Sequence, residues 1–522
     1  MDVGSALSRA ACRCAAFFVG AACLAGHGAA AQSYKLSTPT GANVGRFEVS
    51  PDGRWAVYLD GRIHSVNPLG GESPVQLDPR PAYQRFFGIS PDSRHVIYGA
   101  GHGPTHLTSA RIDGSSSPVE LAGTMGPFAI TADSQTVVFQ TNIGLYSVPL
   151  DGHASPVLIQ ESNRIFGFVL TPDSTRVVYV IEGIQAGGGL AYAADLDGSP
   201  PPVRLNNDNA STLAQYLLIS PDSSRLVYRR GAFGTLGRLF SVPLDASSSP
   251  VPLSSFGSHV NWYGPTTPKI TADGSLVVYE HDLVTDGELF VVPIEGGVPP
   301  RSLSGPLGDG YVTTYELLPD RTHLLLVYGT GSGQDRQLYR AALDGPESPL
   351  LLSAPVTTTY HFKLHPNGTV AIFTGRASFG APIALWAVPV DGSAAPLELN
   401  AGDTAPYGVT NHLDGFGFAG QGDIVVYTTG REGDDPPEPE DMLQLHAVPL
   451  DASAPSQRID GPTVRGGSVR YTGDTFRGII FRVAANGKRV LYLADQRMDR
   501  VVELFGAPLP NASEGGRFGR FR

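Results

Sequence analysis

One nine-residue motif constrains the fold of this sequence more than any other feature. Its first copy is Ser50-Pro51-Asp52-Gly53-Arg54-Trp55-Ala56-Val57-Tyr58. Proline fixes φ, aspartate can bond its own backbone and glycine supplies a positive φ, so the first half predicts a tight turn. The apolar run that follows is rich in β-branched and aromatic residues and predicts a strand. A second motif, as in Leu145-Tyr146-Ser147-Val148-Pro149-Leu150-Asp151-Gly152, predicts a further strand and a hairpin turn.

The pair of motifs recurs along almost the whole chain. The spacing is 40 or 41 residues over the first four copies and lengthens to as much as 65 residues later. The last four copies are degenerate in the turn, as in Pro366-Asn367-Gly368. Ten copies are present, and they begin at Ser50, Ser90, Thr131, Thr171, Ser220, Thr271, Leu318, His365, Ala419 and Ala484.

The strand cores are apolar on consecutive residues, as in Val96-Ile97-Tyr98, and not on alternate ones. Such strands are typical of sheets buried on both faces. A period of 40 to 50 residues with about four strands per unit then predicts an all-β fold, the β-propeller. Ten repeats exceed the usual 4 to 8 blades. No linker-like break separates any two copies, so we expect one large ring of about ten blades, with two smaller propellers as the alternative.

The third copy gives the expected anatomy of a repeat. Its four strands are predicted at 126–131, 136–141, 145–150 and 155–159. The proline of the third strand recurs in other copies, and because proline cannot donate to a central ladder it indicates a bulge or the end of the ladder. The last copy lacks a fourth strand, while Tyr34-Lys35-Leu36-Ser37 precedes the first copy as an orphan strand. We expect this orphan to complete the last blade and close the ring.

Most insertions fall between the second and third strands of a repeat, at 183–189, 229–238, 329–336 and 430–441. Loops at this position share one side of a propeller disc, and insertions in repeat proteins often map to the binding face. The sequence therefore predicts one disc face that carries the long loops.

The first 31 residues predict a secretory signal peptide. Arg9 and Arg13 precede an apolar stretch, and Ala29-Ala30-Ala31 provides a cleavage site before Gln32. A membrane anchor is the alternative, but the apolar stretch is shorter than the roughly 20 residues of a membrane span. The expected domains are thus the signal peptide at 1–31, the propeller at 32–513 and a flexible tail at 514–522, with no membrane span in the mature chain.

Cysteine usage and charge agree with export. All three cysteines lie inside the predicted signal, so the mature chain is expected to contain no disulfide. The whole chain has a net charge of −12, which repels the phosphate backbone of nucleic acids. We therefore expect a periplasmic or secreted protein that does not bind nucleic acid.

The S-P-D-G strand motif followed by L-Y-x-V-x-L-D-G resembles the repeat of TolB-type propellers, which also occurs in the propeller domains of prolyl-oligopeptidase-like enzymes. The resemblance covers nearly all of residues 46–510. It implies a periplasmic β-propeller that binds partner proteins in the cell envelope. TolB carries an α/β domain before its propeller, whereas only residues 32–45 separate the predicted signal from the first repeat here.

Few residues suggest catalysis or metal binding. The candidates are His102 with His106, His361 with His365, and His281 with Asp282, and each is more simply explained as a surface or packed residue. The acidic insertion 432–441 lacks the alternating ligand order of a calcium loop. The tail 517–522 alternates arginine with phenylalanine or glycine and suits an acidic partner or a frayed end. We assign no catalytic, cofactor-binding or metal-binding residue and expect no cofactor.

The predicted function is binding. We expect an exported scaffold that engages a protein or another envelope component through the loop-bearing face. The alternative is a propeller enzyme, of the polysaccharide lyase or phosphoesterase type, with its site at the channel mouth. Convergent His, Asp and Arg side chains would indicate the enzyme. An exposed apolar and aromatic patch on the loop face would indicate the binding protein.

Overall fold

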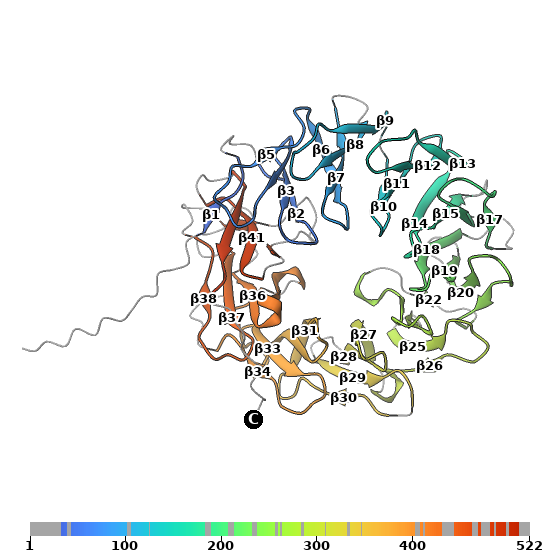
Figure 1. Ribbon diagram of the computed structural model, residues 1–522. Coiled ribbons are helices and arrows are strands. Elements are labelled where there is room, and N and C mark those ends of the chain that lie inside the picture. The colour runs from blue at the N-terminus through green and yellow to red at the C-terminus, as the bar shows by residue number, and fades with distance from the viewer. Residues whose placement is uncertain are drawn as a thin grey trace, which may run out of the picture.

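The computed structural model shows ten small antiparallel sheets arranged in one ring (Figure 1). Nearly all of the regular structure is strand, with four short 3₁₀ helices among the described residues. The structure describes residues 33–38, 43–101, 106–124, 126–182, 189–206, 213–231, 237–255, 259–260, 264–282, 287–307, 310–330, 335–345, 347–401, 408–410, 413–430, 443–461, 468–470, 481–484, 487–496 and 501–510.

Each sheet is one blade, and its strands are paired in chain order from the ring axis outward. Blades 1 to 5 consist of β2 (Arg46–Val49), β3 (Ala56–Leu59), β4 (Ile63–Val66), β5 (Val75–Gln76); β6 (Ala82–Ile89), β7 (His95–Ala100), β8 (His106–Arg111), β9 (Val119–Ala122); β10 (Phe128–Ile130), β11 (Thr136–Gln140), β12 (Gly144–Pro149), β13 (Val157–Glu161); β14 (Ile165–Leu170), β15 (Arg176–Glu182), β16 (Gly189–Asp195), β17 (Val203–Arg204); and β18 (Leu213–Ile219), β19 (Arg225–Gly231), β20 (Arg238–Pro243), β21 (Val251–Pro252).

Blades 6 to 10 follow the same plan, with the innermost strand of blades 6 and 10 split in two. They consist of β22 (His259–Val260), β23 (Lys269–Ile270), β24 (Leu276–Asp282), β25 (Gly287–Pro293), β26 (Arg301–Ser302); β27 (Gly310–Leu317), β28 (His323–Thr330), β29 (Asp335–Ala342), β30 (Leu350–Leu351); β31 (Thr358–Leu364), β32 (Val370–Arg376), β33 (Ala384–Pro389), β34 (Leu397–Glu398); β35 (Phe416–Ala419), β36 (Ile424–Thr429), β37 (Gln444–Pro449), β38 (Gln457–Arg458); and β39 (Val469–Arg470), β40 (Phe481–Val483), β41 (Arg489–Ala494), β42 (Glu503–Pro508), β1 (Tyr34–Lys35). The 3₁₀ helices are η1 (Gly264–Thr266), η2 (Gly305–Leu307), η3 (Leu413–Gly415) and η4 (Gly420–Gly422).

The ring closes as the sequence predicts. β1 pairs antiparallel with β42 and supplies the fourth strand of blade 10, with Tyr34 opposite Gly506. The Leu36 amide also donates to the Leu504 carbonyl at 2.8 Å. Lys35 forms an ion pair with the buried Glu503 carboxylate. One ring of ten blades is therefore confirmed, and the alternative of two smaller propellers is wrong.

Burial on both faces explains the consecutive apolar residues of the second strands. All four residues of β3 are buried, as are five of the six in β7. In most blades an aromatic residue of the second strand stacks on one opposite it in the third strand; the rings of Tyr179 and Tyr192, for example, lie 5.7 Å apart. Neighbouring blades bury these side chains between them, so the core is a series of layers around the ring.

The turn that opens the motif has the predicted geometry, and in the first four copies it makes one contact that the motif does not reveal. The Ser50 hydroxyl donates to Asp52 Oδ1 at 2.7 Å, and the same oxygen accepts the Arg54 amide at 3.0 Å. In addition, the Asp52 amide donates to the Ser93 hydroxyl of the next blade at 3.0 Å. The same contact joins blades 2 to 3, 3 to 4 and 4 to 5, through Ser134, Ser174 and Ser223.

The third-strand proline marks the end of the ladder. Pro149 is the last residue of β12 paired with β11, opposite Thr136, and the pairing with β13 has already ended at Ser147. The hairpin glycine that follows has φ +70°, and a Cβ at Gly152 would lie 2.5 Å from Val119 Cγ1 of blade 2. Glycine therefore serves both the turn and the close approach of neighbouring blades.

The repeat boundaries match the predictions to within two residues. The four strands predicted in the third copy correspond to β10, β11, β12 and β13. The predicted signal at 1–31 and tail at 514–522 lie outside the described residues, as do the acidic insertion 432–441 and the middle of each other long insertion.

Candidate binding surfaces on the loop face and inner wall

The strand order gives the disc two unlike faces. The turns between first and second strands and those between third and fourth strands lie on one face, which we call the turn face. Loops between second and third strands, together with the connections between blades, lie on the opposite face, which we call the loop face. The turn face is built from short Asp-containing turns that bond their own backbone, as at Asp113 and Asp391.

Large apolar side chains are exposed on the loop face. Phe379, at the tip of the loop between β32 and β33, is 89% exposed, and Leu413 in η3 is 41% exposed. The Phe379 loop is held by two hydrogen bonds: the Ala381 amide donates to the Ser378 carbonyl at 3.1 Å, and the Arg376 guanidinium donates to the Ala381 carbonyl. An aromatic side chain on a hydrogen-bonded loop is presented to solvent at little entropic cost, which is typical of a binding anchor.

A second apolar surface lies on the loop face of blades 3 and 4. Ile143, in the tight turn between β11 and β12, is 58% exposed, and Phe166 at the start of β14 is 57% exposed. The Ser162 amide donates to the Ile143 carbonyl at 3.0 Å, and the Gln140 side chain donates to the Ile165 carbonyl at 2.8 Å. These hydrogen bonds hold the two turns next to each other.

Ile143 also lines a pocket of about 430 Å³ between blades 2 and 3. Its lining is mostly apolar and includes the stacked pair Phe139 and Tyr146, whose rings lie 5.6 Å apart. Glu120 stands at its edge, where its carboxylate contacts His106 Nδ1 at 2.7 Å and Arg80 at 3.9 Å. The volume falls in the range of small ligand sites, on the order of 300 to 1,000 Å³.

A larger groove, of about 660 Å³, runs along the inner wall of blades 6 to 9. Three charged residues from neighbouring inner strands line it, namely Lys269, Glu316 and Lys363. Lys269 pairs with the Glu316 carboxylate and donates to the Tyr315 carbonyl at 2.9 Å. The groove therefore combines a neutralised ion pair with a wall of aromatic and proline residues.

An aromatic residue recurs on the inner strands, three positions before the turn, and the sequence analysis missed it. Several of these rings are covered by a cation from the preceding blade: Arg46 lies 5.0 Å from the Phe87 centroid, and Lys363 lies 5.4 Å from that of Phe416. The spacing to the turn motif was the available signal. The series is Phe47, Phe87, Phe128, Phe168, Tyr315, Phe362, Phe416 and Phe481.

A polar residue after the fourth strand forms a second recurring contact that the sequence analysis missed. The Leu239 amide, for example, donates to the Ser254 hydroxyl at 2.9 Å, fifteen residues further along the chain. Equivalent bonds join the third strand of other blades to Asn206, Ser304, Ser353, Asn400 and Asp460.

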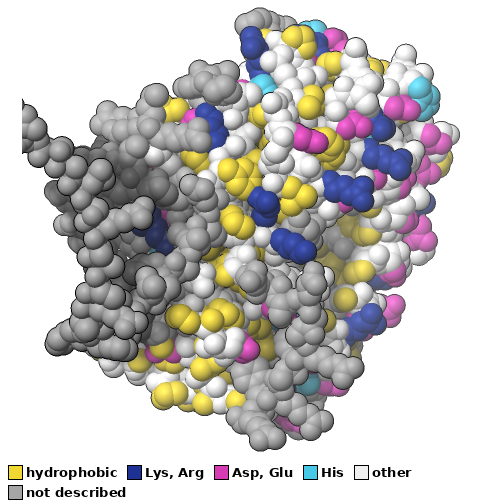
Figure 2. Space-filling model, turned by 60° about the vertical axis from the view of Figure 1, so that its left-hand side comes forward, with side chains coloured by type: hydrophobic (Ala, Val, Ile, Leu, Met, Phe, Trp, Pro, Cys, Tyr) yellow, Lys and Arg dark blue, Asp and Glu magenta, His cyan; other side chains and the backbone are white. Residues whose placement is uncertain are grey.

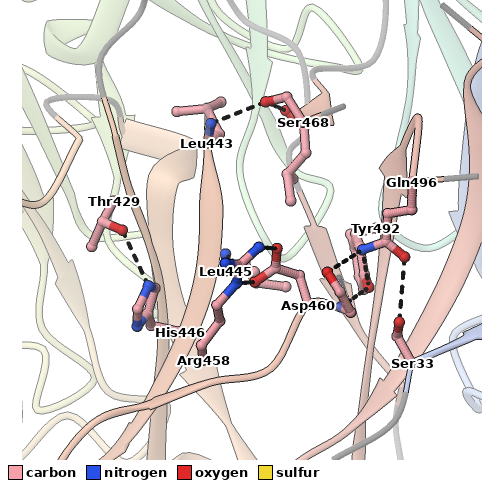
Figure 3. Close-up of polar contacts among 12 residues, drawn as sticks. Ser33, Thr429, Leu443, Leu445, His446, Arg458, Asp460, Ser468, Tyr492 and Gln496 are labelled. Carbon is pink, nitrogen blue, oxygen red and sulfur yellow. Dashed lines mark hydrogen bonds and ion pairs between the residues drawn. The ribbon is translucent and has the colours of Figure 1, made fainter. Parts of the chain in front are cut away.

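After the fourth strand of blade 9 and of blade 1, a buried carboxylate is paired with arginine. Arg458 donates to Asp460 through Nε at 2.9 Å and Nη2 at 2.8 Å, and Figure 3 shows the pair between Leu445 and Tyr492. In blade 1, Arg80 binds Asp78 in the same way, and the Tyr98 hydroxyl donates to Asp78 at 2.7 Å. Burial would raise the pKa of Asp78, but the hydrogen bonds from Arg80 and Tyr98 outweigh it and hold that pKa below its ordinary value.

A buried pair also joins the closing segment to blade 1. His64 Nε2 lies 3.0 Å from Asp60 Oδ1, and the Thr38 hydroxyl donates to Asp60 Oδ2 at 2.7 Å. Burial acts to raise the pKa of Asp60, but the bonds from His64 and Thr38 lower it to about 2. These contacts are structural, since they tie residues beyond β1 to the loop between β3 and β4.

The structure describes only some of the predicted histidine candidates. His106 is at the start of β8 and contacts Glu120, whereas His102 lies outside the described residues. His365 is buried, accepts the Asn367 amide at 3.1 Å and meets Phe418 edge-on at 5.0 Å, so the packed interpretation is confirmed for it.

Two further candidates, His361 and His281, lie in strands. His361 is partly buried in β31, and the ring of His281 in β24 packs edge-on against Phe290 at 5.7 Å. The side chain of Asp282 and all of 517–522 lie outside the described residues. Within the described part of the chain, no group of three or more His, Cys, Asp or Glu residues is placed to hold a metal ion.

The remaining surface is mixed in character. Figure 2, which looks toward the side of the ring carrying blades 9, 10 and 1, shows basic side chains set among hydrophobic ones, with acidic side chains along its right-hand margin. No helix among the described residues is both long and apolar enough to cross a membrane.

The strand topology and the ring closure define the chain as a ten-bladed β-propeller. No family model matches it, and no curated protein does. Matching solved structures include one titled the crystal structure of the eukaryotic initiation factor, with 10% identity and a TM-score of 0.47, covering 70% of this chain and 90% of that one. Another is dipeptidyl peptidase 4 of Porphyromonas gingivalis, with 13% identity and a TM-score of 0.47, covering 78% of this chain and 66% of that one.

Proposed function

We propose that this propeller is an exported binding protein of the cell envelope that engages a partner protein through its loop face. The single observation that carries the proposal is the set of exposed apolar side chains on that face, of which Phe379 is the most exposed. Exposed aromatic residues on an ordered scaffold are typical of protein-binding surfaces. The TolB-like repeat motif and the predicted signal peptide support the envelope as the place of action.

The binding proposal is tested by capture from an envelope extract of the source organism. The bait proteins are the mature chain, Phe379→Ser, and Val298→Ser as a control on the turn face, where Val298 is 54% exposed. We expect the chain and the control to recover the same identified protein and Phe379→Ser to recover at least about five-fold less. Equal recovery by all three baits would contradict a role for Phe379.

Export is tested separately by expressing the full chain with a C-terminal tag and fractionating the cells. The expected product is found outside the cytoplasm and begins at Gln32, as read by mass spectrometry. A cytoplasmic product that retains its first 31 residues would contradict export. It would not bear on the proposed binding surface.

A further inference from the structure

The apolar surface of blades 3 and 4 is bordered by carboxylates. We define it as the blade 3–4 patch, made of Ile143, Leu158 and Phe166, with the adjoining pocket of about 430 Å³. Leu158 is 45% exposed, and its Cδ1 lies against Gly144, next to Ile143. Ile143 lines the pocket itself, and Phe166 follows Ile165, whose carbonyl accepts the Gln140 side chain of blade 3.

Exposed acidic residues stand at the loop-face ends of the strands around this patch. Glu161 ends β13 opposite Gly144, and Glu182 ends β15 opposite Gly189. Glu120 stands at the far side of the pocket but already faces His106 and Arg80. Arg164, the basic residue between these strands, accepts the Glu182 amide on its carbonyl at 2.8 Å.

A surface that has apolar side chains beside exposed carboxylates favours a ligand that has apolar groups beside positive charges. We infer that the blade 3–4 patch binds a segment of a partner protein that carries aromatic or aliphatic anchors next to lysine or arginine. The anchors occupy the pocket and the surface over Ile143 and Phe166, and the basic side chains face Glu161 and Glu182. Complementary charge raises the association rate and fixes the orientation, while the buried anchors supply the affinity. This inference rests on the proposed function and names the kind of partner.

The test uses the mature chain and three synthetic 15-residue peptides labelled with a fluorophore. The first places tryptophan and leucine beside lysines, the second replaces the lysines by glutamates, and the third keeps the lysines but replaces the anchors by serine. Anisotropy gives each Kd at low and at physiological salt. We expect the first peptide to bind at least about ten-fold more tightly than either of the others, and salt to weaken it.

Variants then locate the site. Ile143→Ser with Phe166→Ser is expected to weaken the first peptide about ten-fold or more, as loss of a hot-spot pair does. Glu161→Lys with Glu182→Lys is expected to weaken it by a similar factor and to remove most of the salt dependence. The matched control is Val298→Ser on the turn face, where Val298 is 54% exposed; it should bind like the unaltered chain.

The outcomes separate this inference from the proposed function. If the acidic or the anchor-free peptide binds as well as the first, or if the patch variants bind it normally, the inference is overturned. Extract capture that depends on Phe379 would still support the proposed function in that case. Circular dichroism melts of each variant show whether a loss of binding reflects a loss of fold. Glu161 and Glu182 are exposed, so their replacement by lysine should leave the fold intact and test binding alone.

Discussion

The backbone amide of Asp92 donates to the hydroxyl of Ser134 at 3.0 Å, across the boundary between blades 2 and 3. Ser134 has φ +61°, a left-handed backbone conformation that residues other than glycine rarely adopt. The hydroxyl is thus held where it satisfies a neighbour's amide, at a conformational cost. Ser93, Ser174 and Ser223 repeat this arrangement, with φ between +59° and +64°.

This relationship predicts different results for two substitutions at one position. Ser134→Ala loses the hydrogen bond and keeps the strained φ, so we expect it to lower the free energy of unfolding by about 1 kcal/mol. Ser134→Gly loses the same bond but relieves a strain of about 1 kcal/mol, so the two effects should nearly cancel. Urea denaturation measures both variants. Equal destabilisation by alanine and glycine would contradict the account.

The pairing of Arg458 with the buried Asp460 carboxylate predicts a rescue. Arg458→Met leaves the Asp460 carboxylate buried without its arginine, and we expect a loss of about 2 to 3 kcal/mol, moderated because the Arg458 side chain is 39% exposed. Asp460→Asn in the same chain keeps the bond to the Leu445 amide, which lies 3.0 Å from Oδ1, and should restore about half of that loss. Chemical denaturation of the two single variants and the double variant gives the coupling. Additive effects would show that the charge pair is unimportant.

The turn aspartates predict a loss of stability in acid. Hydrogen bonds from the Thr271 hydroxyl and the Ser275 amide lower the pKa of Asp273 to about 2, from an ordinary value of 3.8. A depressed pKa contributes stability that is present above pH 3.8 and is lost as the pH falls toward 2. Thermal melts between pH 5 and about pH 2 should show this decline.

The control for the acid prediction comes from another blade. Asn367 occupies the same turn position in blade 8, where its side-chain oxygen accepts the Thr369 amide at 3.0 Å. Asp273→Asn should therefore keep the fold and flatten the acid dependence. A variant with unchanged acid dependence would mean that other carboxylates dominate the decline.

The closing strand β1 and the adjacent Leu36 should contribute to the free energy of unfolding of the whole ring. Leu36 is 3% exposed within the core between blades 10 and 1. We expect Leu36→Ala to reduce the free energy of unfolding by about 3 kcal/mol, as buried Leu to Ala substitutions do. A chain that begins at Thr38 lacks β1 altogether and should unfold at lower urea and be digested faster than one that begins at Ser33. Identical digestion of the two chains would show that β1 does not secure the ring.

Local sequence pattern was sufficient for the blades and for their order. Turn chemistry at Pro51-Asp52-Gly53 and the consecutive apolar residues of Val96-Ile97-Tyr98 are set by neighbours within a few residues, so they could be predicted directly. Closure by Tyr34 and Lys35 was also predictable, because a repeat with a missing strand needs one from elsewhere in the chain. The fifteen-residue spacing between Leu239 and Ser254 is also present in the sequence. Only the strand register shows that it places the Ser254 hydroxyl beside the Leu239 amide.

Only the tertiary structure decided which residues meet across blades and which remain exposed. Asp92 and Ser134 are 42 residues apart, and nothing in either turn motif specifies the partner in the next blade. Ile143 and Phe166 are ordinary apolar residues of a strand-rich sequence. They form a surface because the turns that carry them lie side by side on one face, and exposure depends on all surrounding chain segments, not on local sequence.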